Sequence, residues 1–222
     1  MSTLQIQWLG LSDYVMTLGQ QRSFTEQRGP STLDQLWCLE HPSVYTQGLA
    51  GKAEHMLNPG QIPVVQTDRG GQVTYHGPGQ LVMYPLLDLR RQGISIKKYV
   101  FLLEQSIITL LGQFDLLAVR SPGAPGVYIN NQKIAALGIR VRNGCCYHGL
   151  AVNVDLDMGP FAGINPCGYA GLGVTQLADF GIELSVEEVS HRLVPILAQT
   201  LGYDSTADLP LRDRATDGYQ VV

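Results

Sequence analysis

The stretch Gly126–Val154, GVYINNQKIAALGIRVRNGCCYHGLAVNV, decides the fold, because it holds three strand-like runs separated by two turn sequences. Asparagine and glycine tolerate the left-handed backbone of tight hairpin turns, so three consecutive runs joined in this way predict an antiparallel meander. The runs and turns, in chain order, are Gly126–Ile129, Asn130-Asn131, Lys133–Val141, Arg142-Asn143-Gly144 and Cys146–Val154.

Helical periodicity flanks this meander on both sides. Apolar residues recur at three- and four-residue spacing in Ile96–Gln113, which predicts a helix, and a weaker pattern of the same kind covers Tyr14–Gln27. A last helix is expected from Ser185 to about residue 202, since Glu188 follows Ser185 at the spacing of a capping box. Pro195 is expected to bend it.

The segments between residues 33 and 87 predict further strands and two loops. Leu33–Glu40, Gln61–Thr67 and Leu81–Leu87 are strand-like, and Ser43–Gly51 is typical of a turn-rich loop. The glycine-rich segment Arg69–Gln80 predicts a loop whose backbone amides approach a ligand closely.

Length and composition indicate one α/β or α+β domain over residues 1–222, with a loosely ordered tail at about 205–222. Hydrophobic residues make up 45% of the chain and charged residues 15%, below the roughly 25% typical of soluble domains, which favours a large core or an apolar cleft. The net charge of -4 argues against nucleic acid as a partner. Without a secretory signal or a long apolar run, we expect a cytoplasmic protein that does not bind membranes.

The four cysteines have neither zinc-type spacing nor the density of a disulfide scaffold, so no metal site is expected. Cys38 is expected to be a buried small hydrophobe, and Cys145 and Cys146 to belong to a strand. Cys167 differs, because Pro166 and Gly168 place it on a stiff backbone poor in side chains, where an incoming carbonyl can approach. It is the candidate nucleophile, and a purely structural thiol is the alternative.

Lys133 interrupts an apolar strand pattern 34 residues before Cys167. It shares a strand phase with Ala135 and Leu137 unless a bulge at Gly138 shifts the register. An amine on that apolar phase has its charged form disfavoured, so we expect a depressed pKa and proton exchange near neutral pH. Together with Cys167 it suggests acyl transfer through a thioester. The alternative is a lysine at the strand end that extends to water.

His76 and His148 are further candidates for a base or for a group that orients a carbonyl, and either one beside Cys167 would favour a Cys-His hydrolase. Both also fit satisfied structural histidines. Nucleotide binding has little support, because no phosphate-loop or dinucleotide-binding motif accompanies Arg69-Gly70-Gly71.

Four positive charges lie on the connection that leads into the predicted helix at residue 96, namely Arg90, Arg91, Lys97 and Lys98. They fit a solvated helix start. They also fit a docking patch that steers an acidic carrier protein to an otherwise acidic molecule.

Four sequence blocks resemble the lipoate-protein ligase B family, the octanoyl-[acyl-carrier-protein]:protein N-octanoyltransferases. The blocks span most of residues 30 to 180 in the family's order, and the lysine with the Pro-Cys-Gly sequence is highly specific. They are RGGQVTYHGPGQ at Arg69–Gln80, KIAALGIRVR at Lys133–Arg142, YHGLAVNV at Tyr147–Val154 and PFAGINPCG at Pro160–Gly168.

The resemblance implies a fold similar to the biotin protein ligase and lipoate ligase catalytic domains, a mixed, largely antiparallel sheet flanked by helices. It implies transfer of octanoyl from acyl carrier protein to a lysine on the lipoyl domains of 2-oxoacid dehydrogenase E2 subunits and on the glycine cleavage H protein, the first step of endogenous protein lipoylation. Cys167 would carry the acyl group, and Lys133 would favour its thiolate and relay protons. Exchange between thioesters needs no ATP, so no cofactor is expected.

The resemblance also implies three acyl-contacting segments. Small residues in the second and third of them would leave a slot for a straight alkyl chain. The segments comprise Arg69, Gly70, Gly71, Gln72, Val73, Thr74, Tyr75 and His76, then Ala136, Leu137 and Gly138, then Gly149, Leu150 and Ala151.

Two other classes of protein compete with this interpretation. An ATP-dependent lipoate or biotin ligase on the same fold would activate a free acid as an adenylate. A non-catalytic module that binds an acylated carrier would use Cys167 only as a structural residue.

Overall fold

The computed structural model describes residues 2–209, and the predicted meander is present. Strands β8 (Gly126–Ile129), β9 (Gln132–Arg142) and β10 (Cys145–Asn153) pair antiparallel in sequence order. Asn130 and Asn131 in one turn, and Asn143 and Gly144 in the other, have φ between 49° and 78°. This left-handed backbone is the reason why asparagine and glycine mark both hairpins.

The main sheet has eight strands in the order β11-β1-β2-β6-β10-β9-β8-β7. Strand β1 pairs parallel with β2 and β11, and the other neighbours are antiparallel, so the sheet is mixed and largely antiparallel as expected. A second sheet, in the order β4-β3-β5, lies beside it. The remaining strands are β1 (Thr3–Leu11), β2 (Asp34–Glu40), β3 (Val44–Gln47), β4 (Val64–Gln66), β5 (Val73–His76), β6 (Gln80–Leu86), β7 (Val119–Arg120) and β11 (Ser205–Asp208).

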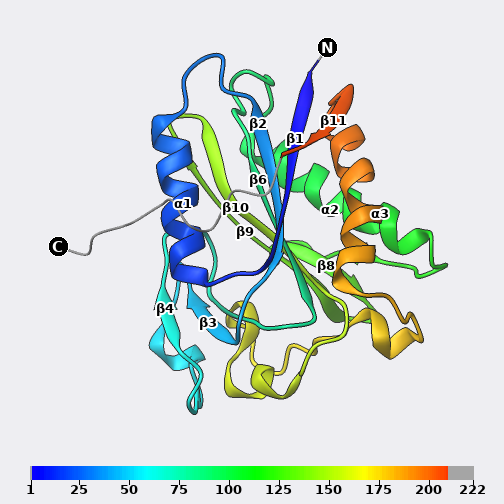
Figure 1. The fold of residues 1–222 in the computed structure, drawn as a ribbon. Helices are drawn as coiled ribbons and strands as arrows, with labels where there is room; N and C mark the ends of the chain where they lie inside the picture. Colours follow the sequence, from blue (N-terminus) through cyan, green and yellow to red (C-terminus); the bar gives the residue numbers. More distant parts are fainter. Residues whose placement is uncertain (1, 210–222) are drawn as a thin grey trace.

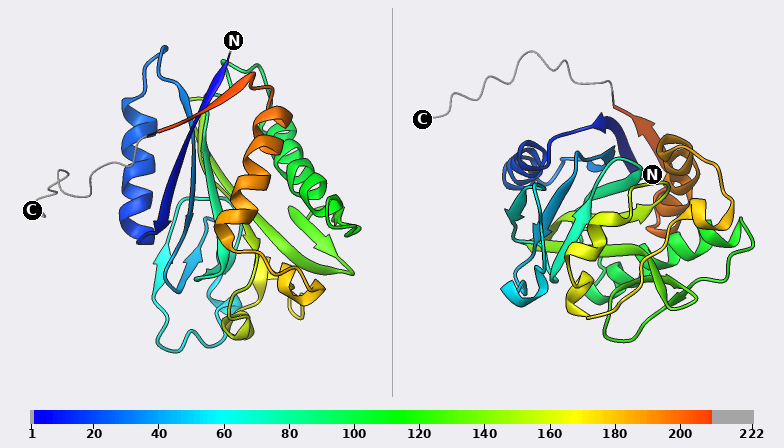
Figure 2. Two further views of the ribbon diagram at one scale, coloured as in Figure 1. Left: turned by 45° about the vertical axis from the view of Figure 1, so that its right-hand side comes forward. Right: turned by 90° about the horizontal axis from the view of Figure 1, so that it is seen from below.

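Helix α1 (Tyr14–Gln27) covers one face of the main sheet, and α2 (Ile96–Gly112) and α3 (Val186–Thr200) cover the other (Figure 1, Figure 2). Alternate residues of β6 divide between the two faces. Leu81 and Met83 pack with the apolar residues of α2 and α3, and Val82 and Tyr84 pack with those of α1. The two-residue period of a strand produces this division.

Side chains cap the starts of helices α1 and α3. Asp13 accepts a hydrogen bond from the Met16 amide at 2.9 Å at the start of α1. Ser185 and Glu188 form the predicted capping box at the start of α3. Pro195 lies inside this helix.

Four short 3-10 helices complete the described elements: η1 (Ala53–His55), η2 (Gly159–Gly163), η3 (Pro166–Gly168) and η4 (Leu177–Phe180).

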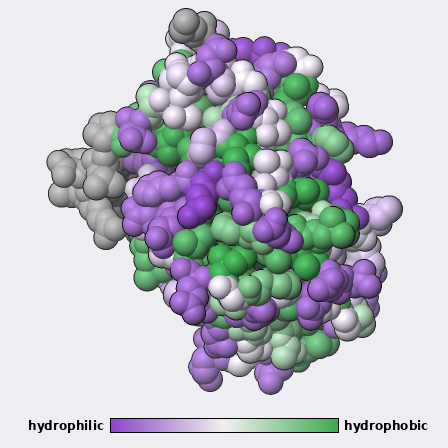
Figure 3. All heavy atoms as spheres, turned by 90° about the vertical axis from the view of Figure 1, so that its right-hand side faces the viewer, coloured by the Kyte–Doolittle hydropathy of each residue, from purple (hydrophilic) through white to green (hydrophobic). Residues whose placement is uncertain are grey.

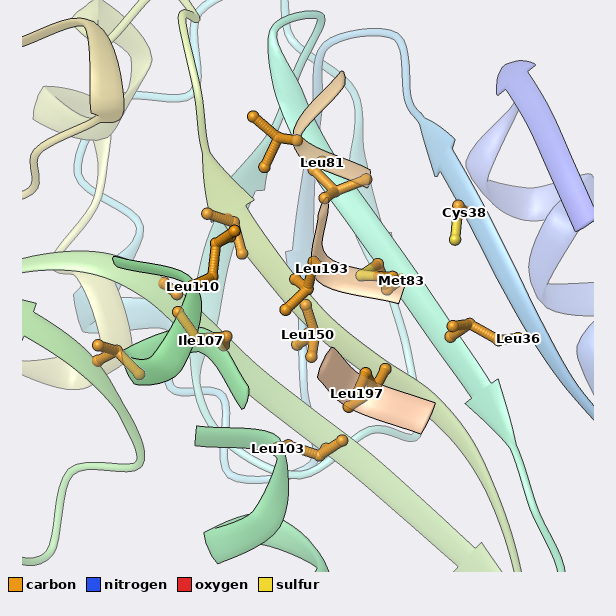
Figure 4. Packing of buried hydrophobic residues seen from close by; sticks show 14 of the residues in the cluster. Leu36, Cys38, Leu81, Met83, Leu103, Ile107, Leu110, Leu150, Leu193 and Leu197 are labelled. Atoms are coloured by element: carbon orange, nitrogen blue, oxygen red, sulfur yellow. The ribbon is translucent and has the colours of Figure 1, made fainter. Parts of the chain in front are cut away.

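The larger core lies between the sheet and the pair α2 and α3. Leu103, Ile107 and Leu110 of α2 meet Leu193 and Leu197 of α3 over the sheet residues (Figure 4). On the outer surface at this side, apolar and polar side chains are interspersed (Figure 3), and Ile96 and Phe101 of α2 are exposed. Within residues 2–209, no helix combines the length and the apolar character that crossing a membrane requires.

Three sequence predictions about the elements are wrong. The expected loop Ser43–Gly51 contains β3, and the expected glycine-rich loop contains β5. These two strands have four residues each and end beside glycines, so their apolar runs are too short to stand out. The expected loose tail begins with β11, whose residues are all exposed and which is held by parallel backbone pairing with β1. The tail residues from 210 onward lie outside the described part of the chain.

Candidate active site

Cys167 lies in the middle of η3 with φ 57° and ψ 15°, a left-handed conformation that is uncommon for a residue other than glycine. The amide of Gly168 donates to the Asn165 carbonyl at 3.0 Å, and the amide of Tyr169 donates to the Pro166 carbonyl at 3.2 Å. These two bonds hold the turn closed around the thiol. Strained backbone of this kind is concentrated at functional sites.

Gly168 is required for this turn. It has φ +81°, and a Cβ atom built on it would lie 3.0 Å from Cγ of Gln72 and 3.2 Å from Nε2 of His55. Both the left-handed conformation and the tight contacts therefore disfavour a side chain at this position. The Cys167 side chain projects from a turn that is packed tightly against Gln72 and His55.

Cys167 is also the one partly exposed thiol. The other three cysteines are buried, as predicted for Cys38, and Cys145 and Cys146 lie in β10, as predicted. Burial raises the pKa of Cys38 and of Cys146 to about 12, which keeps both as neutral thiols.

Lys133 meets Cys167 directly. Its Nζ atom donates to the Cys167 Sγ atom at 2.8 Å and to the Pro125 carbonyl at 3.1 Å, and it lies 5.1 Å from the centre of the Tyr128 ring. The residue is only 3% exposed. Gly126 makes room for this side chain, since a Cβ there would approach Cε of Lys133 to 3.0 Å.

The segment that follows the cysteine turn fixes the position of the lysine backbone. The Lys133 amide donates to the Gly173 carbonyl at 2.9 Å, and the Thr175 amide donates to the Lys133 carbonyl at 3.0 Å. Val174 thereby forms a parallel bridge with Lys133. The Lys133 backbone is thus paired with the segment that follows Cys167, and its side chain contacts Cys167 itself.

The predicted strand phase of Lys133 is wrong. The register between β8 and β9 shifts by one residue, because Val127 pairs with Ala135 whereas Tyr128 pairs with Lys133. The extra residue, Ile134, packs in the main core beside Ala135. A bulge at Ile134, not at Gly138, therefore ends the alternation and directs the Lys133 amine toward Cys167.

The expected depression of the Lys133 pKa is also wrong for this arrangement. Burial lowers the pKa of Lys133, but the adjacent Cys167 as a thiolate raises it, and the net pKa lies above the ordinary value of 10.5. Lys133 is therefore an ammonium as long as Cys167 is a thiolate.

A cavity of about 290 Å³ extends from Cys167 into the molecule. It is lined by every predicted acyl-contacting residue except Tyr75, whose ring packs with Tyr45 and Phe161. Sequence reasoning did not predict the other lining residues, which are Tyr14, Val82, Tyr84, Val100, Gly123, Ala124, Pro125, Ile139 and Tyr169, nor that His148 lines the same cavity.

Paired glycines on β9 and β10 line one wall of this cavity. Gly138 lies opposite Gly149 in the sheet. A Cβ on Gly149 would lie 2.1 Å from the Met83 carbonyl oxygen, and one on Gly138 would lie 2.9 Å from Cδ of Arg69. Glycine is required at both positions so that the neighbouring chains can approach.

Arg69 brings a second positive charge to the cavity. The residue is buried and donates to Thr46 and to the Gly70 carbonyl, and among residues 2–209 it has no carboxylate partner. Burial lowers the pKa of Arg69, and negative charge on Tyr14 or Cys167 opposes that shift. Together, the positive charges of Arg69 and Lys133 favour negative charge in the cavity.

The two candidate histidines do not contact the thiol. His76 bonds through Nδ1 to Gln80 at 2.7 Å, and His148 bonds through Nε2 to Asp68 at 2.9 Å. Burial lowers the pKa of both, that of His76 to about 3. Lys133, and neither histidine, is the hydrogen-bond partner of Cys167.

The predicted docking patch is divided, and its two arginines, Arg90 and Arg91, lie far from Cys167. Arg90 lies under the hairpin turn at Gly144, where an added Cβ would be 2.3 Å from its Cδ, and Arg91 bonds to Asp34 at 2.6 Å. That turn and Lys133 lie at opposite ends of β9, about 30 Å apart at the rise of a strand. The separation argues against Arg90 and Arg91 as a docking site for a carrier that presents a thioester to Cys167, whereas Lys97 and Lys98 are exposed at the start of α2.

Sequence reasoning did not single out His55. Its side chain is 15% exposed, it lies against Gly168, and its Nδ1 atom is buried without a hydrogen-bond partner. Only proximity in the fold reveals it, because the surrounding sequence has no strand or helix pattern that points to a site. In the described part of the chain, no three residues of the His, Cys, Asp or Glu type are grouped so that they would hold a metal ion.

Residues 13–198 match the family model of the lipoyl protein ligase A/B catalytic domain. The octanoyltransferase of Pseudomonas entomophila is 57% identical over 200 residues, which cover 90% of this chain and 93% of the relative. That of Cellvibrio japonicus is 56% identical over 198 residues, covering 89% and 92%. That of Psychromonas ingrahamii is 51% identical over 200 residues, covering 90% and 93%.

Solved structures of low sequence identity show the same fold. A lipoate-protein ligase A bound with ATP superposes with a TM-score of 0.78 at 16% identity, covering 95% of this chain and 90% of the other. The bipartite lipoate protein ligase of Thermoplasma acidophilum gives 0.77 at 17% identity, with 95% and 89% covered. The biotin protein ligase of Aquifex aeolicus gives 0.53 at 13% identity, with 90% and 70% covered. The fold implied by the sequence blocks is thereby confirmed.

Proposed function

The chain belongs to the lipoyl protein ligase A/B catalytic domain family and is an acyltransferase of its octanoyltransferase group, and from this premise we propose that it transfers octanoyl from acyl carrier protein to the lysine of lipoyl domains. The proposed acceptors are the E2 subunits of 2-oxoacid dehydrogenases and the glycine cleavage H protein. One observation carries the proposal: the 2.8 Å contact of Cys167 Sγ with Lys133 Nζ, beside a cavity with a mostly apolar lining.

In the first step, the Cys167 thiolate attacks the carbonyl carbon of the octanoyl thioester. The bond from that carbon to the carrier sulfur breaks, and the proposed proton donor for the departing thiolate is the Lys133 ammonium. The products are octanoyl-Cys167, a neutral Lys133 amine and the free carrier thiol. Because one thioester replaces another, the exchange needs no activation by ATP.

Acylation changes the charge balance around Lys133. The thiolate that raises the Lys133 pKa is gone in the acyl-enzyme, whereas the burial that lowers it remains. The protonation equilibrium of Lys133 therefore shifts toward the neutral amine at this stage. The same lysine is an acid before acylation and a base after it.

In the second step, the acceptor lysine attacks octanoyl-Cys167. An amine with a reference pKa of about 10.4 is almost wholly protonated at neutral pH, so a base must remove a proton. Solvent takes this first proton; as the neutral amine attacks, Lys133 takes the second proton from its nitrogen, the amide bond forms and the carbon–sulfur bond to Cys167 breaks. The Cys167 thiolate and the Lys133 ammonium are restored.

The cavity is proposed to hold the octanoyl chain. Its lining includes the three segments named from the sequence, apart from Tyr75, and the glycines Gly138 and Gly149 let Arg69 and the Met83 backbone approach one wall closely. Burial of an alkyl chain in such a slot contributes binding free energy in proportion to the apolar area removed from water.

The test is incubation with octanoyl-acyl carrier protein, followed by intact mass measurement and peptide mapping. We expect one octanoyl adduct on Cys167, its loss on addition of a lipoyl domain, and no adduct with Cys167→Ala. Cys145→Ala is the matched control and should acylate normally, since Cys145 is buried. An adduct on another cysteine, or turnover by Cys167→Ala, would exclude the thioester route.

Three further outcomes identify the competing functions. Product formed from free octanoate and ATP without carrier protein would indicate an adenylating ligase. Stoichiometric binding of the acylated carrier without loss of its thioester would indicate a non-catalytic binding module. Free octanoate as the main product would indicate a hydrolase.

A further inference from the structure

The cavity has an outer end at the thiol and an inner end among buried rings. Tyr169, beside Cys167, is 48% exposed, whereas Tyr14, Tyr84 and His148 are at most 4% exposed. Strand β5 leads inward from Gln72, which lies against Gly168, to His76 four residues later, about 13 Å at the rise of a strand. The rings therefore form a buried inner end of the cavity, away from the thiol.

These rings form one connected cluster. His41 lies 5.0 Å from Tyr14 and 6.0 Å from His76, measured between ring centres, and His76 stacks on Tyr14 at 5.9 Å. His41 donates through Nδ1 to the Ser12 carbonyl at 2.6 Å and accepts through Nε2 from the Tyr84 hydroxyl at 2.8 Å. The tyrosine and histidine positions at the inner end are thereby fixed by hydrogen bonds and stacking.

A chain of amides determines which nitrogen of His76 carries the proton. Backbone carbonyls only accept, so the amide nitrogens of Asn153 and Gln80 are the donors to Thr175 O at 2.9 Å and to Tyr75 O at 3.3 Å. The Gln80 nitrogen also donates to Oδ1 of Asn153 at 2.9 Å. The remaining Gln80 oxygen must accept, and His76 Nδ1 therefore donates to it at 2.7 Å.

With the proton on Nδ1, the neutral imidazole of His76 has its lone pair on Nε2. Burial and the nearby His41 and Arg69 favour the uncharged ring. Nε2 has no hydrogen-bond partner among residues 2–209, and His76 lines the cavity. The inner end of an otherwise alkyl-binding cavity thus presents a hydrogen-bond acceptor.

We propose that the unpaired Nε2 of His76 is a polar stop that sets the acyl chain length, excluding alkyl chains that reach it and accepting a chain of the same length that ends in a hydroxyl group. The proposal rests on the octanoyl-transfer function above. A methyl end at this position removes water from Nε2 without replacing its hydrogen bond, which is unfavourable, whereas a terminal hydroxyl donates to it.

The test compares two thioesters with the same number of heavy atoms, nonanoyl and 8-hydroxyoctanoyl, in single-turnover acylation of the full chain measured by intact mass. We expect the hydroxylated chain to react at least about tenfold faster than nonanoyl at limiting substrate, since sites that hydrogen-bond a group discriminate strongly against its absence. The octanoyl thioester, measured in parallel, reports on the proposed function itself.

His76→Leu should reverse this preference and admit nonanoyl and decanoyl chains, whereas His191→Leu, an exposed histidine on α3, should not change it. If octanoyl acylates Cys167 but wild type does not prefer 8-hydroxyoctanoyl to nonanoyl, the polar stop is refuted while the transferase function stands. The wild-type comparison needs no variant, so a poorly folded His76→Leu does not remove the test.

A nitrogen NMR spectrum of the imidazoles provides an independent measurement. We expect His76 to be protonated at Nδ1 and unprotonated at Nε2 around neutral pH, and its Nε2 signal to shift when 8-hydroxyoctanoyl is loaded on Cys167. A proton on Nε2, or no shift on loading with the hydroxylated chain, would overturn the proposal.

Discussion

The Nζ atom of Lys133 lies 2.8 Å from the Sγ atom of Cys167, and this distance couples the proton on the amine to the charge on the sulfur. A pair this close titrates as a unit, so an apparent pKa measured for it belongs to both groups. The bulge at Ile134 and the backbone pairing of Lys133 with Gly173 and Thr175 create the contact.

Lys133→Met should raise the pH needed for alkylation of Cys167, because the thiolate loses its ammonium partner. It should also impair transfer to the acceptor amine more than it impairs folding. Lys133→Arg keeps a positive charge but supplies no base at neutral pH, so it should retain part of the alkylation rate and lose transfer. The measurements are alkylation rate against pH, octanoyl transfer rate and thermal unfolding, with exposed Lys97→Met as the control. Unchanged alkylation and transfer in Lys133→Met would make Lys133 a structural strand residue.

Gly168→Ala should displace the cysteine turn. The new methyl group meets Gln72 and His55 at 3.0 and 3.2 Å and adds strain at φ +81°. Gly171→Ala is a matched control, because it has φ +75° but nothing within 4 Å of its added Cβ. Both should lose about 1 kcal/mol of unfolding free energy from backbone strain. Only Gly168→Ala should also slow alkylation of Cys167, and equal alkylation rates in the two variants would contradict this role for Gly168.

The meander was predictable because its signals are local. Asn130-Asn131 and Asn143-Gly144 require left-handed turns, and the runs between them have strand character. Strand β11 has no such signal, since its four residues are exposed and its stability comes from backbone pairing with β1, about 200 positions away. Spacing alone contains no information about such a partner.

The candidate site likewise combines features that the local sequence predicts with features that only the fold creates. Pro166 and Gly168 mark the cysteine turn in the sequence itself, whereas the orientation of Lys133 depends on a bulge that its own strand pattern conceals. The ring cluster was not predictable, because Tyr14 and His76 come from a helix and a separate sheet that meet only in the fold. The blocks that resemble the family supplied the lining residues that periodicity did not.

The buried histidines should make the protein sensitive to acid. Burial lowers the pKa of His41 to about 4 and of His76 to about 3, from an ordinary value of 6.5. Because these pKa values are depressed in the folded state, the free energy of unfolding has its full value above pH 6.5. It decreases as the pH falls toward 4, because the unfolded chain then binds protons that the folded chain does not. Each histidine should lower the free energy of unfolding by on the order of 1 kcal/mol for each pH unit below 6.5.

Denaturant unfolding at several pH values between about 7 and about 4.5 measures this slope. His41→Leu should reduce the slope, although it lowers stability overall by leaving the Tyr84 hydroxyl without its acceptor. The exposed His191→Leu should leave the slope unchanged. A wild-type slope equal to that of His41→Leu would show that His41 is not held neutral by the fold.

The state of Cys167 should decide the sign of the pKa shift at Lys133. With the thiolate present, the Lys133 pKa lies above 10.5, and the causes oppose each other: burial lowers it and Cys167 raises it. Cys167→Ala removes the thiolate and leaves the burial, so the Lys133 pKa should fall below 10.5 in this variant and in the octanoyl-enzyme. A heteronuclear NMR titration of the lysine side chains measures both values. A Lys133 pKa in Cys167→Ala as high as in the wild type would mean that the amine does not change from acid to base during the reaction, and another group would have to accept the proton of the acceptor lysine.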